Sequence, residues 1–517
     1  MKSAGVLRLS LALFAGAATV FGFAPFDLYA LPVVTFGSLV LLWQHAPSPR
    51  AAAAMGFAFG AGLFGVGASW VIVALHTFGE MPLAVAALGT AGFCGFLALY
   101  PALVGWLAAR LAERQSWQRA LAAAAAWPLA EWARSVIFTG FPWLSFGYAT
   151  LPGGSTSALA GYAPIGGVFL VSLATALAAA ALALAVDAIA DARRVRAALL
   201  VGGVAVIGAG GATLQRIEWS TPIDSPLAVS LVQGNITQDV KFDPGFRDAT
   251  FDLYAGMVRQ SRGRLVVLPE SAFPVFADEV PDSVLVQLKE IAGSRNGDVL
   301  VGMFTIEPPL AEGDEPRYYN SVLSVGTARP QLYRKRHLVP FGETIPLDPV
   351  VGWFIRKVLA IPIASQASGD PDQPVHDVAG QRVAIDICYE DAFGAEIRRQ
   401  AGEATLLVNV TNDAWYGRSL AAEQHNQIAA MRALETSRPL LRATNTGITS
   451  AIGHDGREIA RLPWFTRGIL EVEIAGREGT TPYARWGDTV ANIAAAALLL
   501  TAFASRGRGL RTDSAAT

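Results

Sequence analysis

Charge is scarce in this sequence of 517 residues. Lys, Arg, Asp and Glu together make up 16% of it, whereas hydrophobic residues make up 52%. The mean hydropathy is +0.39. A composition this apolar excludes an ordinary soluble protein and predicts a membrane protein. The length predicts more than one domain.

A basic excess is also absent, and cysteine is rare. The formal net charge is −2, which excludes the electrostatic attraction that drives binding to nucleic acid. The two cysteines are Cys94, in an apolar stretch, and Cys388, far along the chain. They are too few and too widely separated for a disulfide framework or a zinc site. At least one of them must be a packed or a reactive thiol.

Long apolar stretches fill the N-terminal part of the chain. A helix needs about 20 apolar residues to cross roughly 30 Å of hydrocarbon. About seven such stretches precede residue 220, near 5–23, 28–44, 51–75, 82–109, 119–138, 164–188 and 197–215. Another lies near 488–505 and is followed by arginines. These stretches predict an α-helical membrane bundle of about eight transmembrane helices.

The composition changes at about residue 226. Short apolar runs rich in β-branched residues then alternate with charged segments compatible with helices, which predicts an α/β domain of roughly 250 residues. The strand-like runs include PLAVSLVQGNI, RLVVLPES, DVLVGMF, RVAIDICYED and ATLLVNVTND. The predicted boundaries are 1–220 for the bundle, 226–477 for the α/β domain, 486–506 for the last membrane helix and 507–517 for a cytoplasmic tail.

Basic residues predict the orientation, because Lys and Arg stay on the cytoplasmic side of short loops. They occur between alternate spans, and the other short loops hold almost none. The residues concerned are Lys2, Arg8, Arg50, Arg110, Arg114, Arg119, Arg193, Arg194, Arg196, Arg506, Arg508 and Arg511. Both termini are therefore expected in the cytoplasm, and the α/β domain in the periplasm, on the outer face of a cell inner membrane. A cleaved signal peptide is the alternative for the first segment.

Gly60, Gly62 and Gly65 form a G-x-G-x-x-G pattern inside the third apolar stretch. No strand precedes them, as dinucleotide binding would require. Close packing of helices through small residues is the better interpretation.

Three residues with suitable chemistry each follow a strand-like run. Glu270 follows RLVVLP, Lys335 lies in LYRKRH, and Cys388 ends RVAIDIC. Taken singly, a cysteine is more often a buried small side chain, and a glutamate or lysine is more often a solvated charge. Together they supply a base, a cation for an oxyanion and a nucleophile.

The motifs around these residues resemble the nitrilase superfamily, and in particular its membrane-bound branch, the apolipoprotein N-acyltransferase family. They are VQGNI at 232–236, LPES at 268–271, HLVPFGE at 337–343, CYED at 388–391, NDAWYG at 412–417 and RATNTG at 442–447. The resemblance covers essentially the whole chain and implies a four-layer αββα sandwich. It implies that Glu270 is the general base, Lys335 the oxyanion stabiliser and Cys388 the nucleophile.

Supporting roles also follow from the resemblance. Glu343 matches an additional acid of the family, and Tyr389 and Glu390 match residues that the family needs beside the nucleophile. Phe242 follows Lys241 at a place where many members have Trp. The aromatic surface is kept there, but an indole hydrogen bond is not.

The resemblance implies a two-step acyl transfer that completes lipoprotein maturation. An acyl chain would pass from a phospholipid, with phosphatidylethanolamine as the expected donor, to a thioester on Cys388. It would then pass to the α-amino group of the S-diacylglyceryl cysteine of an apolipoprotein. Membrane lipid is an expected partner, nucleic acid is not, and neither a cofactor nor a metal is implied.

Several aromatic residues are candidates for contact with lipid substrates. The segment 350–362 carries Trp353 and Phe354 beside basic residues, which predicts an arm that dips into the outer leaflet, with an ordinary packed helix as the alternative. Phe141 and Trp143 lie at a predicted span end and are equally compatible with an aromatic belt. Phe242 and Trp415 complete this group.

Two rival functions remain at this point. A membrane-anchored amidase of the nitrilase type would use the same triad and pass the thioester to water. A transporter or receptor with a ligand-binding outer domain would not need Cys388, but charges in the middle of the spans are scarce. His337, His425 and His454 have no metal-ligand spacing, and a structural role is predicted for them.

Overall fold

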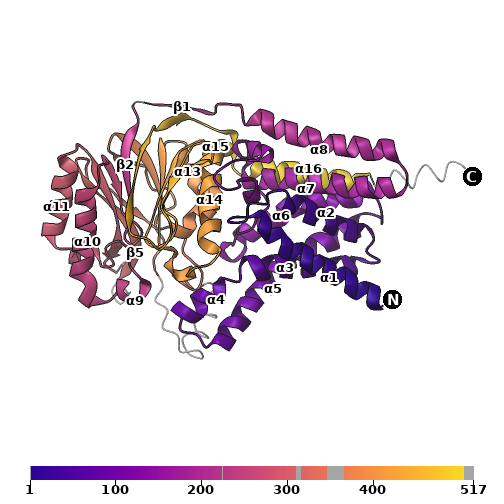
Figure 1. Cartoon of the computed structure of the whole chain (residues 1–517), viewed down its shortest axis with the longest axis horizontal. Coiled ribbons are helices and arrows are strands. Elements are labelled where there is room, and N and C mark those ends of the chain that lie inside the picture. The colour runs from indigo at the N-terminus through magenta and orange to yellow at the C-terminus, as the bar shows by residue number, and fades with distance from the viewer. Residues whose placement is uncertain (1, 224, 310–315, 346–365, 506–517) are drawn as a thin grey trace, which may run out of the picture. The chain divides into compact units, whose positions relative to one another are not determined.

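The computed structural model describes residues 2–223, 225–309, 316–345 and 366–505 (Figure 1). These residues divide into two compact units. The helical unit comprises the described residues of 1–218, 418–427 and 485–517. The sandwich unit comprises those of 219–417 and 428–484. The predicted combination of a helical bundle with an α/β domain is confirmed.

Apolar helices build the helical unit. Its longer helices are α1 (Lys2–Thr19), α2 (Leu31–Gln44), α3 (Pro49–Gly67), α5 (Leu83–Leu111), α6 (Trp117–Val136), α7 (Ala163–Ala190), α8 (Arg194–Leu214) and α16 (Thr489–Ala504). Among the described residues, 5 helical segments are long and apolar enough to cross a membrane, and α2 and α16 are apolar but shorter. The chain is therefore a membrane protein, and the number of about eight spans stays a prediction.

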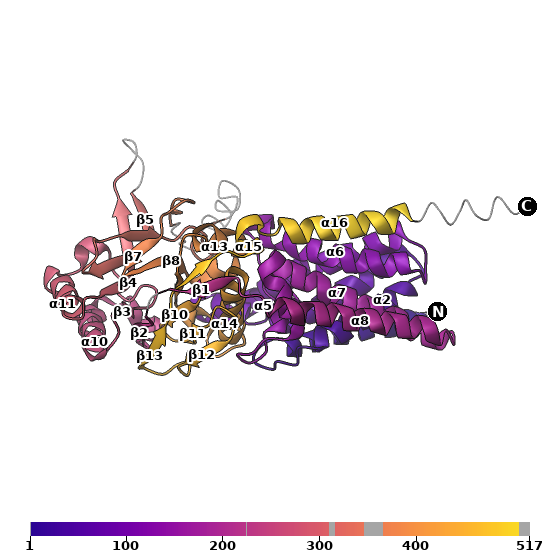
Figure 2. The same cartoon turned by 90° about the horizontal axis from the view of Figure 1, so that it is seen from above.

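Local sequence explains where these helices begin. Ser48 accepts a hydrogen bond from the backbone N–H of Ala51, and Pro49 occupies the first turn of α3. Ser116 caps α6 in the same way, by accepting from the N–H of Arg119. Helix α16 packs along α6 and α7, although about 350 and 300 residues, respectively, separate it from them in sequence (Figure 2).

Two of the three glycines of the G-x-G-x-x-G pattern pack helices together, as predicted. A Cβ on Gly62 would lie 2.1 Å from the carbonyl oxygen of Leu13 on α1, and one on Gly60 would lie 2.7 Å from Cα of Ala98 on α5. Neither distance is sterically possible, so α3 approaches both neighbours through these two glycines. Gly65 has no neighbour within 4 Å of such an atom.

The described part of the sandwich unit contains two six-stranded sheets. The first has the order β13 (Gly468–Ile474), β2 (Leu227–Gln233), β3 (Leu265–Val267), β4 (Asp298–Glu307), β5 (Arg317–Gly326) and β6 (Leu332–Arg334). The second has the order β12 (Glu458–Arg461), β11 (Ser450–Ile452), β10 (Leu440–Thr444), β9 (Leu406–Thr411), β8 (Gln381–Ile387) and β7 (His376–Val378). The short strands β1 (Ser220–Pro222) and β14 (Arg477–Gly479) pair with each other.

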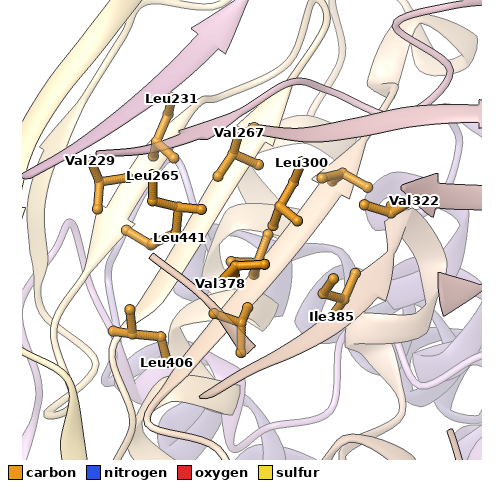
Figure 3. Close-up of a cluster of buried hydrophobic side chains, with 14 of the residues drawn as sticks. Val229, Leu231, Leu265, Val267, Leu300, Val322, Val378, Ile385, Leu406 and Leu441 are labelled. Atoms are coloured by element: carbon orange, nitrogen blue, oxygen red, sulfur yellow. The ribbon is translucent and has the colours of Figure 1, made fainter. Parts of the chain in front are cut away.

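The core lies between the two sheets, where side chains such as Leu231, Val267 and Leu300 of the first meet Ile385 and Leu441 of the second (Figure 3). Side chains alternate between the two faces of a strand, so every second residue enters this core. Burying each branched aliphatic side chain contributes about 1.5–3 kcal/mol. The sheets are therefore held face to face by apolar burial.

Helices cover the outer faces of the sheets. Helices α10 (Arg247–Gln260) and α11 (Asp282–Gly293) pack on the first sheet through a second apolar cluster. Helix α13 (Gly394–Ala401) and the C-terminal half of α14 (Ala421–Thr436) lie along the second sheet (Figure 1). The αββα arrangement implied by the family resemblance is therefore confirmed.

Candidate active site

Glu270, Lys335 and Cys388 each lie just beyond the end of a strand. Glu270 follows β3, Lys335 follows β6, and Cys388 follows β8 of the other sheet. All three side chains are buried. The Nζ atom of Lys335 lies 3.5 Å from Oε1 of Glu270. Charge on Glu270 and on Lys335 also acts on the Cys388 thiol, so the fold brings the three residues together.

Cys388 occupies a strained turn. Its φ angle is +56°, in the left-handed region that residues with a side chain rarely adopt. The strand ends there and a 3₁₀ turn, Cys388–Ala392, begins. The carbonyl oxygen of Cys388 accepts a hydrogen bond from Nδ2 of Asn409 at 3.3 Å. Such strain at a strand-to-helix turn is typical of a nucleophile that must be presented to a substrate.

The Cys388 thiol keeps its proton at rest. Burial raises the pKa of Cys388 well above its usual value, and the negative charge of Glu270 raises it further. The positive charge of Lys335 acts in the opposite sense. Because the thiolate is the nucleophile, the site needs a base that accepts the proton as sulfur attacks.

Glu270 is the carboxylate predicted to be that base. Its Oε1 atom accepts a hydrogen bond from Nδ2 of Asn320 on β5 at 2.7 Å. Its backbone carbonyl accepts a hydrogen bond from Nζ of Lys241, in the short helix α9 (Gln238–Lys241), at 3.0 Å. These contacts orient the carboxylate and fix its main chain.

Lys335 is fully buried and forms an ion pair with the partly exposed Glu343, in which Nζ lies 2.7 Å from Oε1. Burial alone would lower the pKa of Lys335, but the charges of Glu343 and Glu270, and that of Cys388 once it ionises, outweigh burial and raise the pKa. Lys335 therefore stays positively charged. A fixed charge of this kind suits an oxyanion that develops in a transition state. The Oε2 atom of Glu343 also accepts a hydrogen bond from the backbone N–H of Val339 at 2.8 Å. This hydrogen bond closes the turn on which Glu343 lies.

Glu390 joins the turn that begins at Cys388 to the segment after β6. Its Oε1 atom accepts hydrogen bonds from the backbone N–H groups of Arg336 at 2.7 Å and His337 at 3.0 Å. Its Oε2 atom accepts hydrogen bonds from the backbone N–H of Ile387 at 2.6 Å and from the hydroxyl of Tyr333 at 3.0 Å. All these donors belong to residues that flank Lys335 or Cys388, so the contacts of Glu390 hold the two segments together.

Tyr389 packs in an aromatic cluster beside this carboxylate. Its ring lies edge-on to His337 and to Phe393. The His337 ring stacks on Phe393 with centroids 3.6 Å apart, and its Nδ1 lies 3.1 Å from Oε1 of Glu396. These contacts agree with the structural role predicted for His337. Within the described ranges, no three His, Cys, Asp or Glu side chains are grouped to hold a metal ion.

Sequence reasoning missed a buried polar network around Arg442 of β10. Its Nη1 atom donates to Oδ2 of Asp391 at 2.8 Å and to Oδ1 of Asn409 at 2.6 Å, and its Nη2 atom donates to Oδ2 of Asp413 at 3.2 Å. Asn409 also donates to Asp386. The network reaches the turn that begins at Cys388, through Asp391, and the NDAWYG segment, through Asp413.

A sequence signal for this network existed. Asp386, Asn409 and Arg442 each lie between two apolar residues of a strand, and they are direct neighbours across β8, β9 and β10. Polar residues in three adjacent strands, on the face away from the core, could have indicated the network. Lys241 and Asn320 were missed because their contacts with Glu270 are not local in sequence.

The predicted aromatic contacts differ in exposure. Phe242 and Trp415 are 49% and 42% exposed on the sandwich unit. In the helical unit, the Trp143 ring is buried against Trp70 and Phe141. The backbone carbonyl of Trp143 accepts a hydrogen bond from Nη1 of Arg134 at 2.6 Å. The predicted arm with Trp353 and Phe354 lies outside the described residues. Contact of any of these residues with lipid stays a prediction.

Two family models match the chain. Residues 15–181 match the apolipoprotein N-acyltransferase N-terminal domain, and residues 228–483 match the carbon-nitrogen hydrolase family. The first match lies in the helical unit, and the second spans most of the sandwich unit.

Curated relatives match over nearly the whole length. The apolipoprotein N-acyltransferase of Nitrosomonas europaea is 48% identical over 486 residues, which are 94% of this chain and 95% of that protein. The protein of the same name from Ralstonia nicotianae is 40% identical over 507 residues, covering 96% of this chain and 93% of that protein. Among solved structures, a carbon-nitrogen hydrolase from Helicobacter pylori G27 matches 48% of this chain and 89% of that chain, at 16% identity and a TM-score of 0.35.

Proposed function

Because the chain belongs to the apolipoprotein N-acyltransferase family and is an acyltransferase enzyme, we propose that it completes lipoprotein maturation by a thioester on Cys388. The acyl donor is a phospholipid. The acceptor is the α-amino group of the S-diacylglyceryl cysteine at the start of an apolipoprotein. The observation that supports this most directly is the grouping of Glu270, Lys335 and Cys388 beyond strand ends of both sheets.

In the first step, Glu270 takes the thiol proton of Cys388 and the sulfur attacks the ester carbonyl carbon of the phospholipid. The carbonyl oxygen becomes an oxyanion, which the Lys335 ammonium stabilises. The ester C–O bond then breaks. The leaving oxygen takes the proton from Glu270 and departs as the hydroxyl of a lysophospholipid, and the acyl chain stays on sulfur as a thioester.

In the second step, the neutral α-amino group attacks the thioester carbonyl carbon and Glu270 accepts a proton from the nitrogen. The C–S bond breaks as the amide forms. The proton on Glu270 returns to sulfur, so both residues recover their starting states. Glu343, Tyr389 and Glu390 support this chemistry by holding Lys335 and the turn of Cys388 in place.

We place both termini in the cytoplasm and the catalytic domain in the periplasm of an inner membrane. The nitrogen atoms Nη1 of Arg8 and Nη2 of Arg114 lie 3.4 Å and 3.3 Å from the carbonyl oxygen of His45. The His45 ring lies 3.4 Å from Asp187. These contacts support the gathering of basic helix ends at one end of the bundle, which the positive-inside rule assigns to the cytoplasm.

We also propose the following domain boundaries, acyl donor and lipid contacts. Residues 1–220 form the bundle, 226–477 the catalytic domain, 486–506 the last membrane helix and 507–517 a cytoplasmic tail. Phosphatidylethanolamine is the expected donor. The candidate lipid contacts remain Phe242, Trp353, Phe354, Trp415, Phe141 and Trp143.

Intact mass spectrometry tests the covalent intermediate. The purified protein and a Cys388→Ala variant are incubated with phosphatidylethanolamine, and then with a peptide that carries an S-diacylglyceryl cysteine with a free amino group. We expect the parent protein to gain the mass of one acyl chain, labile to hydroxylamine, and to lose it to the peptide as an amide. The variant gains nothing.

The other outcomes separate the rival functions. Discharge to free fatty acid at a rate that does not depend on the peptide indicates a hydrolase. Absence of acylation on Cys388 from phosphatidylethanolamine or any other bilayer phospholipid contradicts the proposed acyl transfer.

A further inference from the structure

A second lysine lies beside the triad. Lys241 is 3% exposed, and its Nζ atom donates to the backbone carbonyl of Glu270 at 3.0 Å. The same atom lies 5.8 Å from the ring centroid of Phe242, within reach of a cation–π contact. An ammonium buried in this way is costly unless negative charge or hydrogen-bond acceptors compensate it.

The Glu270 main chain is held on two sides. On one side is Lys241. On the other, a Cβ on Gly302 of β4 would lie 2.4 Å from the carbonyl oxygen of Pro269, so the β4 backbone packs directly against this turn. Ser271 has a φ of +48°, which makes the turn sharp. A sharp turn aims a side chain reproducibly only if its backbone is fixed.

The charges around the thiol also favour a role for Lys241. The other two cations of the site are already paired, Lys335 with Glu343 at 2.7 Å and Arg442 with Asp391 at 2.8 Å. Formation of a buried thiolate needs positive charge nearby. The Nζ atom of Lys241 instead donates to a neutral backbone carbonyl, that of Glu270.

Lys241 is electrostatically coupled to the reacting groups. Burial lowers the pKa of Lys241 to about 8, and the charge of Glu270, together with that of Cys388 once it ionises, acts in the opposite sense. Its sequence neighbours Asp239 and Asp243 are exposed. The charge on Lys241 is therefore present below about pH 8 and is lost as the pH rises above that value.

We propose that Lys241 is a positioning residue for the acyl transfer, which holds the Glu270 main chain and supplies positive charge that favours the thiolate of Cys388. The proton still passes from sulfur to Glu270, as in the proposed function on which this role rests. Lys241 does not touch the acyl group.

The test measures alkylation of Cys388 by iodoacetamide as a function of pH, in a Cys94→Ala background so that one thiol remains. Lys241→Gln keeps a hydrogen-bond donor but removes the charge, and Lys241→Arg keeps both. Lys289→Met, on the exposed side of α11, is the matched control. Single-turnover acylation by phosphatidylethanolamine is measured on the same proteins.

We expect Lys241→Gln to slow alkylation about tenfold at pH 7, which corresponds to a rise of about one unit in the pKa of Cys388. The difference from the parent should shrink above about pH 8, where the parent loses the charge on Lys241. Acylation should fall in parallel. Lys241→Arg should stay close to the parent, and Lys289→Met should equal it.

Two results would overturn the role of Lys241. One is parental alkylation and acylation by Lys241→Gln at every pH. The other is an equal loss in Lys241→Gln and Lys241→Arg that does not vary with pH, which indicates packing alone. If Lys241→Gln does not fold, the Lys241→Arg variant provides the test. Arginine keeps its charge at pH 9, where Lys241 has lost it, so Cys388 in this variant should be alkylated at least as fast as in the parent protein. A slower rate would refute the proposal. Alkylation needs no acyl donor, so a failure of the proposed function is seen separately.

Discussion

The ammonium of Lys335 lies 2.7 Å from a carboxylate oxygen of Glu343, and the Lys335 side chain has no exposed surface. The same nitrogen is 3.5 Å from Glu270. Lys335 is thus shared between a carboxylate that keeps it charged and the carboxylate of Glu270, which we propose as the base. This sharing leads to a prediction about Glu343.

Replacing Glu343 with Gln should impair acyl transfer without removing any residue of the triad. Lys335 would lose the partner that contributes most to keeping its pKa raised, and it would pair more closely with Glu270. We expect single-turnover acylation to slow about 100-fold, as for the loss of one oxyanion donor. Asp372→Asn, which breaks an exposed ion pair with Arg399, is the control and should acylate at the parental rate. A parental rate in Glu343→Gln would refute the supporting role.

Glu270→Gln should separate the ionisation of Cys388 from catalysis. The negative charge of Glu270 raises the pKa of Cys388, so its removal lowers that pKa and makes the thiol easier to ionise. We expect alkylation of Cys388 by iodoacetamide at pH 8 to be as fast as in the parent or faster. Acyl transfer should nevertheless fall by about 10²–10⁴-fold, because the proton acceptor is lost. A joint loss of alkylation and acylation would instead indicate a structural role for Glu270.

Arg442→Met should destabilise the sandwich unit. Arg442 is fully buried and pairs with two buried carboxylates, which would both lose this positive charge. We expect the free energy of unfolding to fall by about 3–5 kcal/mol. Thermal unfolding in detergent checks this, with Arg382→Met as the exposed comparison, for which about 1 kcal/mol or less is expected. Equal unfolding temperatures for the two variants would contradict the importance of the network.

Glu390→Gln should loosen the link between the two segments that carry Lys335 and Cys388. The carboxylate accepts four hydrogen bonds, and an amide would turn an N–H group toward one pair of donors. We expect a loss of about 1–3 kcal/mol in stability and slower acylation. Tyr333→Phe removes one of the four donors and should cost about 1 kcal/mol. If Tyr333→Phe lowers stability and acylation as much as Glu390→Gln does, the hydrogen bonds from the backbone to Glu390 contribute nothing measurable, which contradicts the proposed link.

Much of the site could be predicted because its residues follow strands. The apolar runs before Glu270 and Cys388 mark β3 and β8, and a polar residue directly after a buried strand lies at a sheet edge whatever the rest of the fold does. Glycine packing in α3 was predictable for a similar reason, since the pattern lies in one helix. Signals of this kind depend on residues that are close in sequence.

The contacts that tune the chemistry could not be predicted in this way. Asn320 lies 50 residues from Glu270, and Arg442 lies 51 residues from Asp391. Such partners meet only after strands pair in a particular register and two sheets pack face to face, and a shift of one residue in β10 would turn Arg442 into the core.

The sequence by itself determined that this chain has an apolar helical part and an α/β part, and that a glutamate, a lysine and a cysteine end strands of the latter. The tertiary structure alone decided which charges neutralise one another around the thiol. The physical reason is that hydropathy and strand periodicity are properties of neighbouring residues. The ionisation of a buried group depends instead on charges brought from distant segments into a medium of low dielectric constant.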